Sequence, residues 1–126
     1  MKARDAKRVS AQEAVSHIQS GQRLTLPLCC GLPQTLVAAL VADYERLRDV
    51  EIVSGLQIIY PFLGDGMERS FTYRTWQCAP SIRQYMEKGT VKYIPMRQGD
   101  AVRVFSRRGV WPVNTALIQV SPPDDH

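Results

Sequence analysis

Apolar and polar positions follow two different periods along the first third of this chain. Leu24, Leu26 and Leu28 recur at every second position, which is the period of an extended strand. From Leu36 the apolar positions recur every three or four residues, which is the period of an amphipathic helix. The pattern predicts a strand over 24–28, a turn over 29–33 and a helix over 34–47. Pro33 supports this boundary, because its fixed φ and missing amide hydrogen suit a first helical turn.

The rest of the chain continues the alternation of strands and helices. The predicted helices cover 10–20, 80–88 and 100–108, and the predicted strands cover 50–56, 91–94 and 115–120. The segment 57–79 is expected to hold a short strand or loop, a turn at 64–66 and an extended piece over 71–76. Its aromatic residues are expected in the core rather than in a pocket. Alternating elements favour a mainly parallel sheet in an open, three-layer α/β domain of the Rossmann-like kind.

Two strands are expected at the centre of this sheet. They are 24–28 and 115–120, and the second is a nearly continuous apolar run, of the kind that is buried on both faces of a parallel sheet. The length suits a single domain over residues 1–126. A strand, a Gly-containing turn and a helix in succession place free backbone amides at the carboxyl end of the strand, where ligands bind in such sheets. Geometry alone allows an anion or carbonyl site there, or no site.

Residues 29–40, Cys-Cys-Gly-Leu-Pro-Gln-Thr-Leu-Val-Ala-Ala-Leu, resemble the first strand–turn–helix of the coenzyme A transferases. In that superfamily a Gly-rich turn runs into Gly-x-Pro and an apolar helix. Residues 116–126, Ala-Leu-Ile-Gln-Val-Ser-Pro-Pro-Asp-Asp-His, resemble the acetyl-CoA hydrolase/transferase branch, in which the end of a core strand reads Ser-Pro-Pro-Asp. The Ser-Pro-Pro-Asp match is the more specific. Together the two matches indicate the N-terminal domain of that family over nearly the whole chain.

The resemblance implies acetyl-CoA and acetate metabolism, by transfer of CoA between carboxylates or by thioester hydrolysis. It implies coenzyme A and acyl-CoA as substrates, with carboxylates as co-substrates and no bound cofactor. The nucleophile of the superfamily is a glutamate that forms a glutamyl-CoA thioester, and it lies in the second half of the family chain. None of Glu13, Glu45, Glu51, Glu68 and Glu87 stands in its motif, and they are interpreted as caps or solvated charges. No catalytic residue is therefore expected in this chain.

The resemblance assigns two loops to the substrate site. The turn after the first strand is the substrate and oxyanion loop, because backbone amides there would stabilise a developing negative charge. The end of the last strand forms a second loop. This chain carries bulkier residues than the family glycines just before the Gly-x-Pro motif, and one of them, Pro27, has no amide to donate. The predicted residues are Cys29, Cys30, Gly31, Leu32 and Pro33 in the first loop and Ser121, Pro122, Pro123 and Asp124 in the second.

Composition and charge exclude several other functions. No apolar run approaches a membrane span. Three cysteines without a disulfide pattern favour a cytoplasmic protein. Cys29 and Cys30 could act as nucleophiles at a helix N-terminus, but they are expected to be buried and inert, and no spacing suits a metal. The net charge of +4 would help to hold a polyanion such as CoA. A weak nucleic-acid contact is a minority interpretation of the basic cluster Arg97, Arg103, Arg107 and Arg108.

Two further hypotheses concern completeness and partners. The chain reaches His126 where the loop of the last strand would begin, so it is expected to be the front part of a longer enzyme, inactive by itself. Such a part is expected to self-associate or to need a C-terminal partner half, with 115–126 and 29–33 near the contact. The alternative is a stand-alone CoA-binding or small-molecule-binding module, or an assembly subunit, without catalysis.

Overall fold

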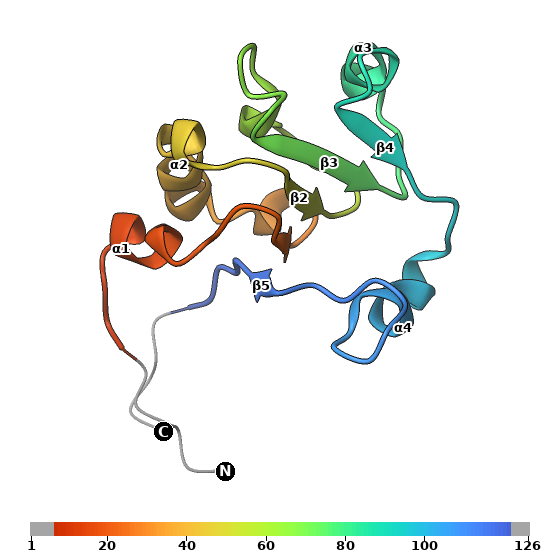
Figure 1. Cartoon of the computed structure of the whole chain (residues 1–126). Helices are drawn as coiled ribbons and strands as arrows, with labels where there is room; N and C mark the ends of the chain where they lie inside the picture. The colour runs from red at the N-terminus through yellow and green to blue at the C-terminus, as the bar shows by residue number, and fades with distance from the viewer. Residues whose placement is uncertain (1–6, 122–126) are drawn as a thin grey trace.

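The computed structural model describes residues 7–121 and shows an open five-stranded sheet with helices on both faces (Figure 1). All strand pairs are parallel, and the strand order is β4-β3-β2-β1-β5. The three-layer α/β prediction is confirmed. The strands are β1 (Arg23–Thr25), β2 (Val50–Val53), β3 (Phe71–Thr75), β4 (Val91–Tyr93) and β5 (Thr115–Ala116). The helices are α1 (Ala11–Ser16), α2 (Gln34–Ala42), α3 (Arg83–Glu87) and α4 (Ala101–Phe105).

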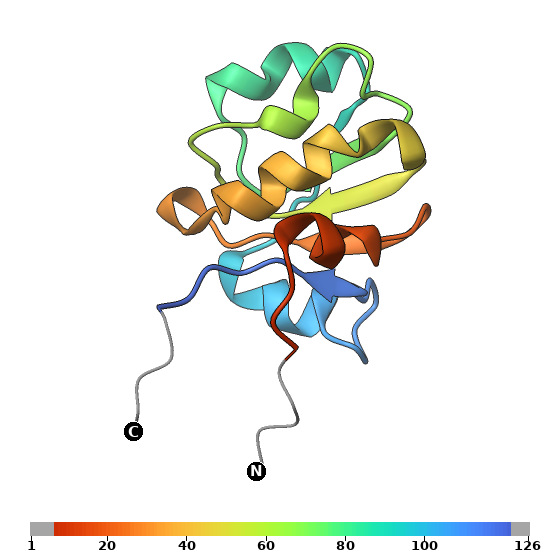
Figure 2. The same cartoon turned by 90° about the vertical axis from the view of Figure 1, so that its left-hand side faces the viewer.

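The direction of the chain across the sheet explains the two helical layers. From β1 to β4 each strand adds to the same side, whereas β5 returns to the far side of β1. Parallel crossovers share one hand, so a crossover that runs in the opposite direction places its helix on the opposite face. Figure 1 accordingly shows α2 and α4 on opposite sides of the sheet. Figure 2 shows α1 and α2 together in front of the strands.

The core follows the two-residue period of the strands. Leu24, Ile52 and Tyr73 are fully buried and point to the α1 and α2 side. The opposite face carries a smaller cluster, in which Trp76 stacks on Phe105 of α4 with ring centroids 5.7 Å apart. The aromatic residues of 71–76 thus pack in the core, as expected. α1 begins as predicted, because the Ser10 hydroxyl accepts from the Glu13 amide at 3.0 Å.

The prediction for the last strand is wrong in two respects. β5 covers only Thr115–Ala116, and within residues 7–121 it lies at an edge of the sheet, paired with β1 alone. Leu117 is buried, but Ile118 is 57% exposed and Val120 is 74% exposed. An apolar run indicates that both faces of a strand are buried. It does not indicate which residues bury them. β1, by contrast, lies inside the sheet as expected.

The remaining predictions hold for the type of element and differ at the ends. α2 stops at Ala42 rather than at 47 and is followed by a short 3-10 turn, Tyr44–Arg46. β2 stops at Val53 because Ser54–Gln57 turns over the end of the sheet. The segment before β3, expected to hold a short strand or loop, is a loop with the 3-10 turn Pro61–Leu63. α4 covers five residues of the predicted 100–108, and Asp100 caps it without a side-chain hydrogen bond.

Candidate functional site

The strand order places a switch point between β1 and β5. The chain leaves β1 in one direction across the sheet and returns to its other side for β5. In open α/β sheets the loops that follow two such strands separate, and the crevice outside their carboxyl ends binds ligands. Residues 29–33 follow β1, and residues 117–121 follow β5. The fold therefore brings both predicted loop regions to the same edge of the sheet.

A groove occupies this switch point. It has a volume of about 630 Å³ and lies between the start of α2 and the segment after β5. Its lining includes Pro33, Gln34 and Thr35 on one side and Ile118 and Gln119 on the other. Of the second predicted loop, Ser121 is exposed at the end of the described range. Pro122, Pro123 and Asp124 lie outside the described residues.

The loop after β1 is a 3-10 turn, Cys29–Gly31, followed by Leu32 and Pro33. Cys29 has a φ of 50°, a left-handed conformation that is uncommon for a residue with a side chain. Gly31 is required for space, because a Cβ there would lie 2.8 Å from the Cβ of Pro27. The loop is thus tightly folded and departs from a glycine-rich turn at Cys29. Local strain of this kind is often found at functional sites.

Three amides of this loop are already used. Cys29 N donates to Leu56 O at 2.9 Å, Gly31 N to Leu28 O at 3.0 Å, and Leu32 N to Cys29 O at 3.4 Å. Among the hydrogen bonds of residues 7–121, none uses the Cys30 amide. The first amides of α2 have no partner within the helix. Cys30 and the first turn of α2 are therefore the donors that the loop can offer to a carbonyl or carboxylate oxygen.

A buried polar network, which the sequence analysis missed, supports the loop from below. Ser54 and Gln57 are 0% and 3% exposed. The Gln57 side-chain amide donates to Pro27 O at 2.7 Å and to Ser54 Oγ at 2.8 Å, and Ser54 Oγ donates to Leu26 O at 2.8 Å. These bonds fix the backbone at Leu26 and Pro27, just before the loop. The sequence signal that could have revealed this network is a serine and a glutamine soon after a buried strand.

Tyr73 extends this network from β3. Its hydroxyl donates to the carbonyl of Gly55. Burial raises the pKa of Tyr73, so the hydroxyl stays protonated at neutral pH and remains a donor. Gly55 itself is tightly enclosed, because a Cβ there would lie 2.4 Å from Leu28 and from Gln77. The loops after β1, β2 and β3 are thus packed against one another at the carboxyl edge.

The five glutamates lie away from this edge or are fully engaged. The interpretation of Glu51 as a solvated charge is wrong. Its side chain is 19% exposed, and it accepts from Arg23 Nε at 2.6 Å, from Arg74 and from Trp111 Nε1 at 3.2 Å. Burial by itself raises the pKa of Glu51, but hydrogen bonds and positive charge from Arg23 and Arg74 outweigh burial and lower it. Glu51 is a structural anion on the face opposite α2.

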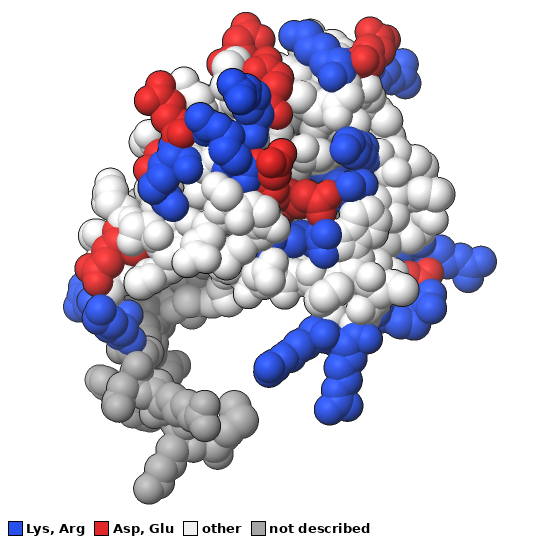
Figure 3. Space-filling view, viewed as in Figure 1, with Lys and Arg blue, Asp and Glu red and all other residues white. Residues whose placement is uncertain are grey.

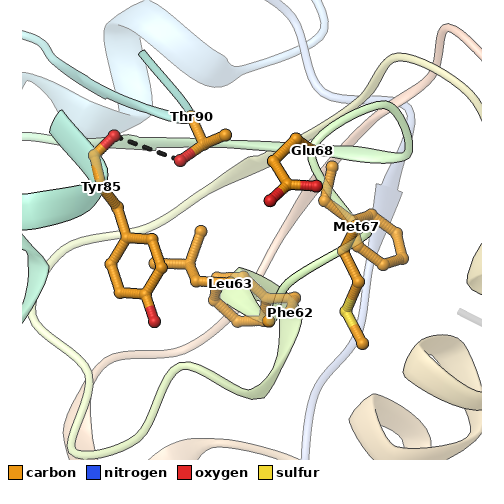
Figure 4. Close-up of a pocket in the computed structure, with 8 residues that line it drawn as sticks. Phe62, Leu63, Met67, Glu68, Tyr85 and Thr90 are labelled. Atoms are coloured by element: carbon orange, nitrogen blue, oxygen red, sulfur yellow. Dashed lines mark hydrogen bonds between the residues drawn. The ribbon is translucent and has the colours of Figure 1, made fainter. Parts of the chain in front are cut away.

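A small pocket is lined by another glutamate, the exposed Glu68, but is no substrate site. Figure 4 shows Glu68 beside Phe62, Leu63 and Tyr85 in this space. Its volume is about 10 Å³, enough for about one water molecule. It lies among the segments that precede β3 and β4, at the opposite end of the sheet from the loop after β1. Glu68 therefore takes no part in the candidate site.

The other sequence candidates are also placed. Cys29 is partly exposed and Cys30 is exposed, so the expectation that these two thiols are buried is wrong. Among residues 7–121, no cluster of three metal-ligating side chains occurs. No helix in that range has the length and apolarity to span a membrane.

In the basic cluster, Arg103 pairs with Asp100 at 3.2 Å. Figure 3 shows other basic side chains projecting near α4 with few acidic neighbours.

Comparison with known proteins decides the family. The sequence model of the acetyl-CoA hydrolase/transferase N-terminal domain matches residues 3–126. The chain belongs to this family. It is 31% identical over 121 residues to a 4-hydroxybutyrate coenzyme A transferase of Clostridium kluyveri, covering 95% of this chain and 28% of the relative. It is 28% identical over 120 residues to a butyryl-CoA:acetate CoA-transferase of Anaerostipes caccae, covering 93% of this chain and 26% of that protein.

Solved structures support the same fold. The crystal structure of RipA from Yersinia pestis matches with a TM-score of 0.79 at 23% identity, covering 94% of this chain and 30% of that one. The resemblance to the acetyl-CoA hydrolase/transferase family and the predicted CoA transferase-like fold are thus confirmed. The chain spans a little over a quarter of the length of these family relatives. It corresponds to their N-terminal domain.

Proposed function

We propose that this chain is the N-terminal domain of a CoA transferase or acetyl-CoA hydrolase that acts on acyl-CoA thioesters and carboxylates. The observation that carries the proposal is the match over residues 3–126 together with a groove at the switch point, where the loop after β1 borders the segment after β5. In this role the domain supplies backbone donors and part of the substrate crevice. The corresponding setting is acetyl-CoA and acetate metabolism in the cytoplasm. The three cysteines without a disulfide agree with such a reducing compartment.

The loop after β1 would hold the thioester carbonyl. The Cys30 amide and the first amides of α2 are the available donors, and each donor in such a site is worth a few kcal/mol in transition-state stabilisation. The network of Ser54 and Gln57 holds these donors in place without reorganisation during the reaction. Attack on that carbonyl by a glutamate of the remaining part of a family-length protein would expel CoA thiolate and leave an acyl-glutamyl anhydride. The thiolate would then attack the glutamyl carbonyl, release the acyl group as its carboxylate and form the glutamyl-CoA thioester, so that one difficult step is divided.

The domain is proposed to be inactive by itself. The five described glutamates lie at helix ends, in exposed positions or in the Glu51 cluster, and none borders the groove at the switch point. The exposed side chains of Ile118 and Val120 beside β5 support a contact with the remaining part of the protein or with a second copy. The edge of β5 also leaves backbone groups for a further strand.

Complementation tests this proposal. The purified chain is incubated with acetyl-CoA and a carboxylate acceptor, first alone and then with the remaining three quarters of a family-length protein as a separate polypeptide. We expect thioester exchange only in the mixture. Thioester exchange by the chain alone would contradict the proposal that the remaining part supplies the catalytic glutamate. A mixture that forms a stable complex without any exchange would contradict the proposed activity and favour a binding module.

A further inference from the structure

We infer that a second groove, along the outer side of α2, binds the apolar tail of the acyl group. It has a volume of about 430 Å³, within the usual range for small-molecule sites. Among its eight lining residues, all of them described, only Gln34 has a polar side chain. The apolar walls come from α2 and from the segment that follows β2, and they include Leu32, Val37, Ala38, Val41, Ile59 and Pro61.

This groove adjoins the candidate site. Leu32 belongs to the loop after β1, and Gln34 lines both this groove and the groove at the switch point. An acyl group whose carbonyl lies against the loop after β1 can therefore extend along α2. The nine residues of α2 rise about 13 Å, which is room for a tail of several methylenes. Figure 2 shows α2 running beside the segment that leads to Pro61–Leu63, with which it packs.

The loop that supplies Ile59 to the wall opposite α2 is unusually apolar for an exposed loop, although its Leu56 and Ile58 do not themselves line the groove. Leu56, Ile58 and Ile59 are 36%, 67% and 49% exposed, and they follow one another within four residues. The Leu56 carbonyl accepts from the Cys29 amide, so this loop is anchored to the loop after β1. Exposed apolar side chains that cluster beside a candidate site indicate an apolar ligand or partner. No charged residue lines the groove, so it offers nothing to the phosphates of CoA.

The shape and position of the groove suit an acyl tail. The groove is concave and apolar, and its lining includes Leu32 of the loop against which the carbonyl would lie. The inference rests on the proposed function and adds a substrate class to it: unbranched apolar acyl groups longer than acetyl. Each methylene transferred into the groove would tighten binding about fourfold, until the groove is filled.

Carboxylates of increasing length test the inference on the isolated chain. Acetate, butyrate, hexanoate and octanoate are titrated while the methyl resonances of Leu32, Val41 and Ile59 are followed by NMR. Octanoate should shift these methyls, and acetate should not. The dissociation constant should fall about fourfold per added methylene. Equal affinities across the series, or octanoate shifts confined to other methyls, would overturn the inference.

Two matched variants locate the site. Ile59→Ser should weaken octanoate binding several-fold, whereas Val102→Ser, at an exposed apolar residue of α4 that lines neither groove, should leave it unchanged. Ala38→Phe, at an exposed position of α2, should fill the groove and abolish the length dependence. Equal losses in both serine variants would contradict the groove. If octanoate does not bind, the proposed function is unaffected, because thioester exchange after complementation tests that function separately.

Discussion

Arg23 and Glu51 lie opposite each other on β1 and β2, and Arg23 Nε donates to Glu51 Oε2 at 2.6 Å. Trp111, from the segment between α4 and β5, covers the pair and donates to the same oxygen. Arg23 also donates to Pro112 O at 2.9 Å, and Asn114 bonds to the Arg23 backbone. The pair therefore connects the centre of the sheet to the segment that leads into β5, and the residues that follow β5 form one side of the groove at the switch point.

Loss of the Glu51 charge should destabilise the domain. Glu51→Gln leaves two partly buried guanidinium groups without their anion, and we expect the free energy of unfolding to fall by about 1–3 kcal/mol. Urea denaturation followed by tryptophan fluorescence measures this. Glu87→Gln, at an exposed position, is the control and should change stability by less than about 0.5 kcal/mol. Equal stability of both variants would contradict a structural role for the cluster.

The same carboxylate predicts a loss of stability in acid. The pKa of Glu51 is lower in the folded protein than its ordinary value of 4.5. The unfolded chain therefore binds the proton more readily, so this contribution is complete above that value and disappears as the pH falls through the lowered pKa. Urea midpoints measured between neutral pH and about pH 3 should fall more steeply in the parent protein than in Glu51→Gln. Parallel pH profiles would show that Glu51 is not responsible.

Close packing beneath the loop after β1 should make Gly55 intolerant of a side chain. Gly55→Ala would place a Cβ 2.4 Å from Leu28 and from Gln77. We expect a cost of about 1–3 kcal/mol, because Leu28 must repack and Gln77 Oε1 must give up the hydrogen bond that it accepts from the Leu56 amide. Gly99→Ala is the control, because a Cβ there meets nothing within 4 Å and the residue has no positive φ. Thermal unfolding of both variants measures the difference, and a fully stable Gly55→Ala would show that the carboxyl edge is loosely packed.

The apolar side chains after β5 predict association. In the isolated chain Ile118 and Val120 are exposed beside a sheet edge, so we expect the mass measured by light scattering to rise with concentration. Ile118→Lys should suppress this rise. Val102→Lys is the control, because Val102 is 79% exposed on α4, on the opposite face of the sheet from α2. A monomeric, cooperatively folding chain over the whole concentration series would favour a self-sufficient binding module.

The sequence predicted the layers but not the side-chain clusters. Alternating periods, Pro33 and Gly31 were sufficient to place β1, the turn and α2, because these signals are local. The Glu51 cluster depends on the register of β1, β2 and β3, which joins residues 28 and 23 positions apart. Ser54 and Gln57 are polar residues that become buried only when three loops meet. Long-range register and loop packing leave no periodic pattern in a single sequence.

The position of β5 shows the same limit. The apolar run 115–120 predicted a buried central strand, whereas residues 118–120 are exposed beside an edge. Periodicity reports which faces of a strand need cover, and here the cover is not among residues 7–121. The resemblance carried by 29–40 and 116–126 identified the family, which neither composition nor charge could do.

The most direct test of the account is to locate the covalent CoA adduct. The chain is incubated with an acyl-CoA, alone and together with the remaining part of a family-length protein, and intact-mass and peptide mass spectrometry follow. The account predicts a glutamyl-CoA thioester in the mixture only, on the complementing polypeptide. An adduct mapped to Glu13, Glu45, Glu51, Glu68 or Glu87 of this chain would contradict it.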